Sequence, residues 1–132
     1  MDRPRHSDQR RVVAPAFGPS EIARMAIEVR KRTSELLDGL PIGEEFDWVD
    51  RVSIELTTGM LAILFDYPWE KRRDLTLWSD WGGDIEAALN PATKDIRQQH
   101  LIDMTNALDA LMTERKGKPP TGDLISAMAH SD

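Results

Sequence analysis

The sequence predicts an all-α protein of about six helices. Apolar residues recur at spacings of three and four along most of the chain, whereas the alternation of apolar and polar residues that is typical of strands is nearly absent. Glycine and proline residues separate these periodic stretches and mark the expected helix ends. The 132 residues are 40% hydrophobic and include four tryptophans, which is enough apolar material for a folded core.

The first two helices are expected on either side of a proline break. A first helix would run from about residue 4 to residue 14 and end at Pro15. Gly18 followed by Pro19 has the form of an N-cap with proline at the first helical position, and it predicts a second helix to about residue 40. Apolar residues fall mostly on one side of this second helix and charged residues on the other, so we expect it to lie on a surface.

A third, more apolar helix is expected between residues 48 and 66. Asp47 is a good candidate for its N-cap, and Pro68 lies just beyond its end. From Ile54 to Phe65 the only charged residue is Glu55. A helix that is apolar nearly all round is expected to be buried on several sides.

The rest of the chain repeats the pattern of helix and breaker. A fourth helix is expected from residue 69 to about residue 81, and a fifth from about residue 93 to residue 116. The acid-rich run from residue 80 to residue 86 is interpreted as a solvated turn. Residues 117–122 hold two glycines and two prolines and form the clearest linker. After it, Asp123 is expected to cap a last helix that has barely begun when the sequence ends, as though something larger came after it.

Composition excludes several classes of protein. The formal net charge of -6 argues against general nucleic-acid binding, which needs a broad basic surface. The longest apolar stretch is far shorter than the roughly 20 residues of a membrane span, and no secretory signal is visible. We therefore expect a cytoplasmic protein with no membrane span.

Motifs for common chemistries are missing from the sequence. We find no zinc-protease helix motif, phosphate-binding loop, dinucleotide fingerprint, nucleophile elbow or EF-hand loop. The chain has no cysteine, which excludes disulfides, thiolate metal sites and cysteine nucleophiles. The three histidines lie too far apart in sequence for local metal-ligand spacing. No pair of carboxylates has surroundings that indicate hydrolase chemistry.

One pair of residues near the start has the pattern of a carboxylate-binding site. His6 and Arg10 are four residues apart, so they share one face of a helix. The guanidinium of Arg10 presents a planar set of donors suited to a carboxylate, and His6 can donate from a ring nitrogen. Taken alone, the spacing favours the simpler alternative, a basic helix end that only faces solvent.

The surrounding residues resemble a known family. The pattern Asp2-x-Pro4-x-His6-x-x-x-Arg10-Arg11, continuing to Phe17, resembles the segment of bacterial cytochromes P450 that forms the helix on the proximal side of the haem. This resemblance implies that His6 and Arg10 bind the haem propionates. It also implies that Arg11 and the nearby arginines belong to a basic face that meets an electron-donor protein.

The resemblance continues in order along the chain. Residues 46–58 and 60–70 are similar to the bacterial subfamily that hydroxylates the ends of alkane and fatty-acid chains, and residues 75–81 and 119–126 continue it. It is weaker between residues 84 and 118. On this basis residues 1–132 are identified as a partial cytochrome P450 domain, from the proximal haem-side helix through the substrate-roof helices to the start of the next helix.

The family implies a haem-thiolate monooxygenase that inserts one oxygen atom of O2 into a C–H bond. Terminal hydroxylation of medium-chain alkanes or fatty acids is the expected reaction, with a hydrophobic small molecule as substrate. Electrons would come from a ferredoxin-type donor with an NAD(P)H-dependent reductase. The family's iron is held by a cysteine thiolate, which this chain lacks. We therefore expect that the 132 residues alone have no metal ligand, do not retain haem and oxidise nothing.

A different class of function stays open on the residues alone. The chain could be a self-contained helical interaction module without a cofactor, whose basic first helix contacts an acidic partner. In either case the four tryptophans, Trp48, Trp69, Trp78 and Trp81, are interpreted as core residues rather than as the lining of a hydrocarbon pocket. The stripe of Met104, Leu108, Leu111 and Met112 has the same ambiguity. His100 is interpreted as a histidine at the surface or core edge.

Overall fold

The computed structural model describes residues 4–131, and in this part of the chain every regular element is helical. The all-α prediction is confirmed. There are seven α-helices in the described range, against the expected six or so. They are α1 (Arg5–Val13), α2 (Pro19–Asp38), α3 (Glu55–Phe65), α4 (Arg73–Gly83), α5 (Ile85–Leu89), α6 (Lys94–Lys116) and α7 (Leu124–Ala129). Shorter helical segments are η1 (Ala14–Phe17), η2 (Val49–Ile54) and η3 (Trp69–Lys71).

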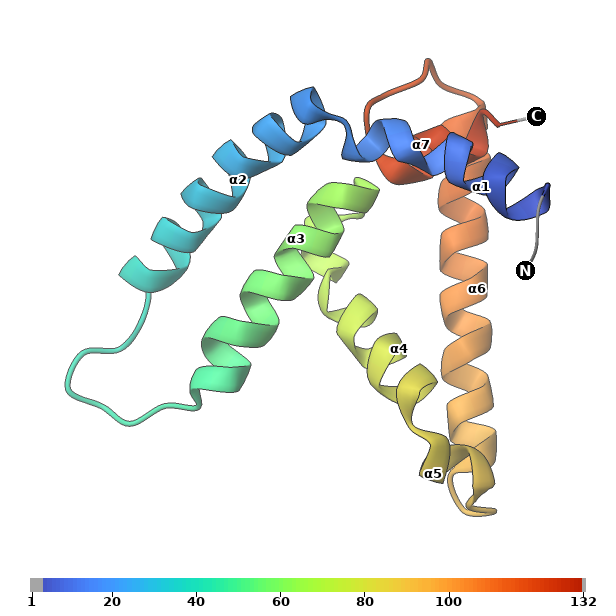
Figure 1. Ribbon diagram of the computed structural model, residues 1–132. Helices are drawn as coiled ribbons and strands as arrows, with labels where there is room; N and C mark the ends of the chain where they lie inside the picture. Colours follow the sequence, from blue (N-terminus) through green and yellow to red (C-terminus); the bar gives the residue numbers. More distant parts are fainter. Residues whose placement is uncertain (1–3, 132) are drawn as a thin grey trace.

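The helices form an open arrangement in which successive pairs pack together (Figure 1). Helices α2 and α3 lie side by side on one flank, and α4, α5 and α6 form a hairpin on the other. Helix α7 packs against the end of α6, and α1 crosses next to α7. The first and the last helices of the described range, α1 and α7, therefore meet at one end of the molecule.

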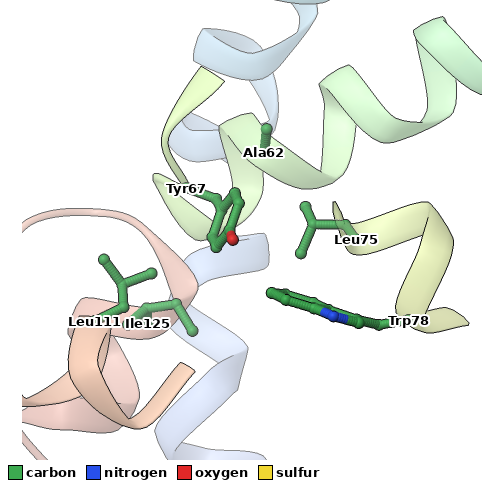
Figure 2. Packing of buried hydrophobic residues seen from close by; sticks show 6 residues of the cluster. All are labelled: Ala62, Tyr67, Leu75, Trp78, Leu111 and Ile125. Atoms are coloured by element: carbon green, nitrogen blue, oxygen red, sulfur yellow. The ribbon is translucent and has the colours of Figure 1, made fainter. Parts of the chain in front are cut away.

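A small core joins α3, α4, α6 and α7 (Figure 2). It consists of the buried residues Ala62, Tyr67, Leu75, Trp78, Leu111 and Ile125. The rings of Tyr67 and Trp78 meet edge to face with their centroids 6.2 Å apart. Burial raises the pKa of the Tyr67 hydroxyl, and the nearby carboxylate of Asp74 raises it further, so the phenol stays neutral inside the core.

Two of the sequence interpretations concern this core. In the predicted stripe on α6, Leu111 belongs to the core and the other three residues pack against it. Among the tryptophans, Trp78 is buried, but Trp48 is 55% exposed, so the core interpretation is wrong for Trp48. Trp48 comes after the irregular segment of residues 39–47, and its ring stacks on Phe46.

Helix α3 has neighbours on several sides, as expected, because α2, α4 and α7 all contact it. Its start differs from the prediction. The side chain of Asp47 accepts a hydrogen bond from the amide of Asp50 at 3.1 Å, as an N-cap does, but the segment η2 that leads into α3 is π-helical rather than α-helical. Apolar periodicity does not distinguish these two kinds of helix over so few residues.

The expected solvated turn at residues 80–86 is not observed. Asp80 belongs to α4, and Asp84 is the N-cap of the short helix α5, where its side chain accepts a hydrogen bond from the amide of Ala87 at 2.8 Å. Asp84 therefore starts a helix instead of ending one, which accounts for the additional element.

The linker and its capping residue are as expected. Residues 117–123 leave α6 without regular structure, and Asp123 caps α7 by accepting a hydrogen bond from the amide of Ser126. His100 lies at the core edge, where its ring stacks on Trp81 with the centroids 5.1 Å apart. Across the described residues, no helix combines the length and the apolar character that a bilayer crossing needs.

Candidate functional site

The structure places His6 and Arg10 on one face of α1, above an open groove of about 630 Å³. Gln9 lies with them at the polar side of the groove. Val13, Ala14 and Phe17 supply its apolar side. The groove thus has hydrogen-bond donors at one end and apolar surface at the other.

The polar groups of this groove are available for a ligand. Both His6 and Arg10 are exposed, and neither makes an ion pair or side-chain hydrogen bond within residues 4–131. Among residues 4–131, the ion pair on this helix joins Arg11 to Asp8 at 3.4 Å. None of the residues of α1 is buried, so this helix contributes to the surface of the protein and not to its core.

Helix α1 is held in place by the segment η1 and by the packing of both against α7. The segment η1 turns the chain at Pro15, and Ala16 in that segment is buried. Both α1 and η1 contact α7. The site is therefore positioned by an element more than a hundred residues further along the chain, a relation that the sequence pattern does not reveal.

Sequence reasoning found two of the groove residues and missed the others. Gln9, Val13 and Phe17 come after His6 at offsets of three, seven and eleven, which is the spacing of one helix face. That spacing is the signal that could have found them. It extends the pair of His6 and Arg10 into a strip that also offers apolar contact.

A second cluster of charged residues lies between α2, α3 and α4. Glu55 accepts hydrogen bonds from Arg72 at 2.7 Å and from Arg73 at 2.5 Å, and Arg73 also reaches Asp50 at 2.8 Å. Burial raises the pKa of Glu55, but the two guanidinium groups outweigh burial and leave the pKa below its ordinary value. Binding to Asp50 and Glu55 raises the pKa of Arg73.

This charged cluster encloses an indole ring. The guanidinium groups of Arg32 and Arg72 lie over the ring of Trp69, 4.2 Å and 4.7 Å from its centroid. Gly59 of α3 lies against the same ring. Glu55 is already bound by both of its arginine partners, so the cluster joins three helices and its carboxylate is not free. The Nε atom of Arg32 is buried and makes no hydrogen bond within the described residues.

Metal binding by protein side chains has no candidate in the described residues. Nowhere in residues 4–131 do three or more His, Cys, Asp or Glu side chains gather closely enough to hold an ion. The groove on α1 offers donors to an anionic group and an apolar wall, so it fits the carboxylate edge of a flat apolar ligand. It supplies no thiolate ligand for an iron atom, because the chain has no cysteine.

Comparisons with known proteins decide the family. A comparison with models of protein families gives no match. The solved structure of CYP153D17 from Sphingomonas sp. PAMC 26605 is 57% identical over the whole chain, with a TM-score of 0.85, and the chain covers 33% of it. Cytochrome P450 TbtJ1 is 28% identical over the whole chain, with a TM-score of 0.79 and 35% of its length covered. The chain belongs to the cytochrome P450 family.

The curated relatives agree with this assignment. Erythromycin C-12 hydroxylase of Saccharopolyspora erythraea is 30% identical over 97% of the chain and 32% of its own length. The cytochrome P450 chain described here thus spans about a third of the length of the relatives that it matches. The family is one of monooxygenases with haem as cofactor, so the resemblance inferred from residues 2–17 and 46–70 is confirmed at the family level.

Proposed function

We propose that residues 1–132 form the haem-side and substrate-roof part of a cytochrome P450 monooxygenase, in which α1 presents His6 and Arg10 to the haem propionates. The observation that carries this proposal is the groove on α1, where both side chains lie on one exposed face above an apolar wall. A propionate is a carboxylate attached to a flat apolar ring system, so the two sides of the groove match the two parts of the ligand.

The reaction is that of the family. One oxygen atom of O2 enters a C–H bond of the substrate and the other leaves as water, which takes two electrons and two protons. We propose that a ferredoxin-type protein delivers the electrons from an NAD(P)H-dependent reductase. Arg5 and Arg11, both exposed on α1, are suited to meet the acidic surface of such a donor.

The proposed substrate class is medium-chain alkanes or fatty acids, hydroxylated at the chain end. Support comes from the similarity of residues 46–70 to that subfamily and from the 57% identity to CYP153D17. Haem supplies the oxygen chemistry when it is bound through a cysteine thiolate. Because this chain has no cysteine, we propose that residues 1–132 alone are inactive and do not retain haem in that mode.

A chimera tests the proposal. Residues 1–132 would replace the matched third of CYP153D17, which supplies the remaining two thirds of the fold. We expect the chimera to bind haem and to show the thiolate-type carbon monoxide difference spectrum. His6→Ala and Arg10→Ala each remove one donor to the propionates, and each is expected to lower haem affinity about tenfold.

The matched control is Arg24→Ala, which removes an exposed arginine of α2 that pairs with Glu21 at 2.9 Å. It should leave haem content unchanged. Equal haem content in the double variant His6→Ala/Arg10→Ala and in the unmodified chimera would contradict the assigned role. The alternative, a helical interaction module without a cofactor, predicts that residues 1–132 fold cooperatively alone and that the chimera binds no haem.

A further inference from the structure

A cavity of about 220 Å³ lies between α2, α3 and the ring of Trp69. Its apolar wall is formed by Val29, Leu36, Leu56, Met60 and Ile63. Its charged lining consists of Arg32, Glu35, Glu55 and Arg72. One water molecule occupies about 30 Å³ in the liquid, so the cavity has the volume of roughly seven waters and can hold a small organic molecule.

Three of the four charged groups in this cavity already have partners or solvent. Glu55 accepts hydrogen bonds from Arg72 at 2.7 Å and from Arg73 at 2.5 Å. Arg72 also donates to the carbonyl oxygen of Trp69 at 2.9 Å. Glu35 is exposed, so water can solvate its carboxylate. The two carboxylates of the lining therefore do not require a cationic ligand.

Arg32 is the charged residue whose donors are incompletely used. Its Nη1 lies 3.3 Å from the carboxylate of Glu35, which is longer than the roughly 2.7–2.9 Å of a strong charge-assisted hydrogen bond. Its Nε is buried and makes no hydrogen bond within residues 4–131. A guanidinium group only donates, and a buried donor without an acceptor is destabilising. The cavity therefore lacks a hydrogen-bond acceptor beside Arg32.

The ring of Trp69 keeps the charge of Arg32 at the cavity wall. The guanidinium carbon of Arg32 lies over this ring, 4.2 Å from its centroid. Such a contact attracts the cation but supplies no conventional acceptor for its N–H groups. A carboxylate offers the pair of acceptor oxygens that best matches a guanidinium group.

We propose that this cavity binds a small alkyl carboxylate, whose carboxylate accepts hydrogen bonds from Arg32 and whose alkyl chain lies against the aliphatic and methionine side chains of the wall. The flexible side chain of Met60 can adapt to a chain of this kind. The proposal does not depend on haem binding at the groove on α1, because the two sites have no lining residue in common.

Methyl NMR tests the proposal, because Met60 lines the cavity whereas Met104 and Met112 pack against the core. Octanoate is titrated into the 132-residue chain and into the chimera with CYP153D17, each labelled with 13C at the methionine methyl groups. The signal of Met60 is identified by its loss in Met60→Leu. We expect octanoate to shift this signal with a Kd on the order of 1 mM and to leave Met104 and Met112 unchanged.

Two further probes separate the contributions of charge and alkyl chain. Acetate has the carboxylate without the long chain, and octanol has the chain without the charge. Each is expected to bind at least about tenfold more weakly than octanoate.

Arg32→Met keeps an unbranched side chain beside Trp69 but removes the charge and the donors. It should weaken octanoate binding about tenfold and abolish the preference for octanoate over octanol. Arg24→Ala is the matched control, because Arg24 lies on the same helix outside the cavity and pairs with Glu21. Val29→Phe fills the apolar part of the cavity and should also weaken binding, so it provides a second test if Arg32→Met does not fold.

Three results would overturn the proposal. The first is a Met60 signal that does not respond to octanoate, and the second is an equal response to octanol. The third is a response in the 132-residue chain that is absent from the chimera, because the rest of the fold would then fill the cavity. Haem content of the chimera reports separately on the groove of His6 and Arg10, so failure of one proposal is distinguishable from failure of the other.

Discussion

At the residue scale, the interactions with the largest expected effect on stability are those of Glu55. Its side chain is 18% exposed and bound by Arg72 and Arg73. Glu55→Gln removes the charge between two guanidinium groups, and we expect it to lower the free energy of unfolding by about 2 kcal/mol at pH 7. Urea unfolding of both proteins measures the difference.

The effect of Glu55→Gln should depend on pH with a definite sign. The pKa of Glu55 in the folded protein lies below its ordinary value of 4.5. Its contribution to stability is therefore fully present above pH 4.5 and is lost as the pH falls through the folded pKa. At pH 3 the two proteins should differ less than at pH 7. Glu114→Gln removes an exposed carboxylate that pairs with Lys118, and it should change the unfolding midpoint little at either pH.

At this scale, the sequence could predict which residues share a helix face but not which residues of different helices are in contact. His6 and Arg10 were selected because residues four apart share one face of a helix and because the surrounding residues resemble the haem-side helix of the family, and their binding of haem propionates stays a prediction. Glu55 and Arg72 are 17 residues apart and belong to different elements, so their contact depends on how α3 and α4 pack. No local pattern contains that information, and the pair became visible only in the structure.

At the element scale, the position of α3 depends on a glycine that faces Trp69. A Cβ at Gly59 would lie 3.0 Å from the far edge of the Trp69 ring, and the ring has little freedom because Arg32 and Arg72 lie over it. Alanine normally stabilises a helix interior by about 1 kcal/mol relative to glycine. Here we expect Gly59→Ala to destabilise the protein by about 1 kcal/mol, because the overpacking cost exceeds that gain.

The helix-propensity gain and the overpacking cost of Gly59→Ala can be separated in a variant that lacks the Trp69 ring. In Trp69→Leu the obstructing ring is gone, so Gly59→Ala should become stabilising relative to Trp69→Leu alone. Gly83→Ala is the matched control within the chain, since a Cβ at Gly83 meets nothing within 4 Å. Thermal unfolding of these variants measures whether Gly59→Ala stabilises or destabilises the protein in each background. If Gly59→Ala stabilised the unmodified protein, the Trp69 ring would have to move aside at little cost, and the overpacking prediction would be wrong.

Helix boundaries were predicted well where a cap or a breaker marks them. Pro19 and Asp123 each stand at the helix start that the sequence indicates, because both act through local backbone chemistry. The end of α3 was approximately located, yet its form was not anticipated: Asp66 adopts the left-handed conformation with φ 48°. Arg115 of α6 binds the side chain of Asp66 and its carbonyl oxygen, so a distant element supports this turn.

At the scale of the whole molecule, the core is small relative to the apolar surface that the chain exposes. Ile42 is 97% exposed, and Ile85 and Leu89, four residues apart on α5, are 75% and 79% exposed. Figure 1 shows that the α2–α3 pair and the α4–α6 hairpin diverge on the side away from α7. The sequence indicated the number of helices approximately, but not which of their apolar faces lack a partner, since periodicity marks a face and not what covers it.

This exposed surface distinguishes the two classes of function. If residues 1–132 are part of a larger cytochrome P450 fold, the isolated chain should bind a hydrophobic dye such as ANS strongly, self-associate in sedimentation experiments and unfold over a broad range of urea concentration. In the chimera with CYP153D17 the dye signal should fall several-fold, because the added two thirds of the fold cover the apolar faces. Ile85→Ser/Leu89→Ser should reduce dye binding of the isolated chain, whereas the same change at the buried Leu75 should unfold it. A monomeric isolated chain with little dye binding and a sharp unfolding transition would instead favour the self-contained helical module, because its apolar residues would then need no further cover.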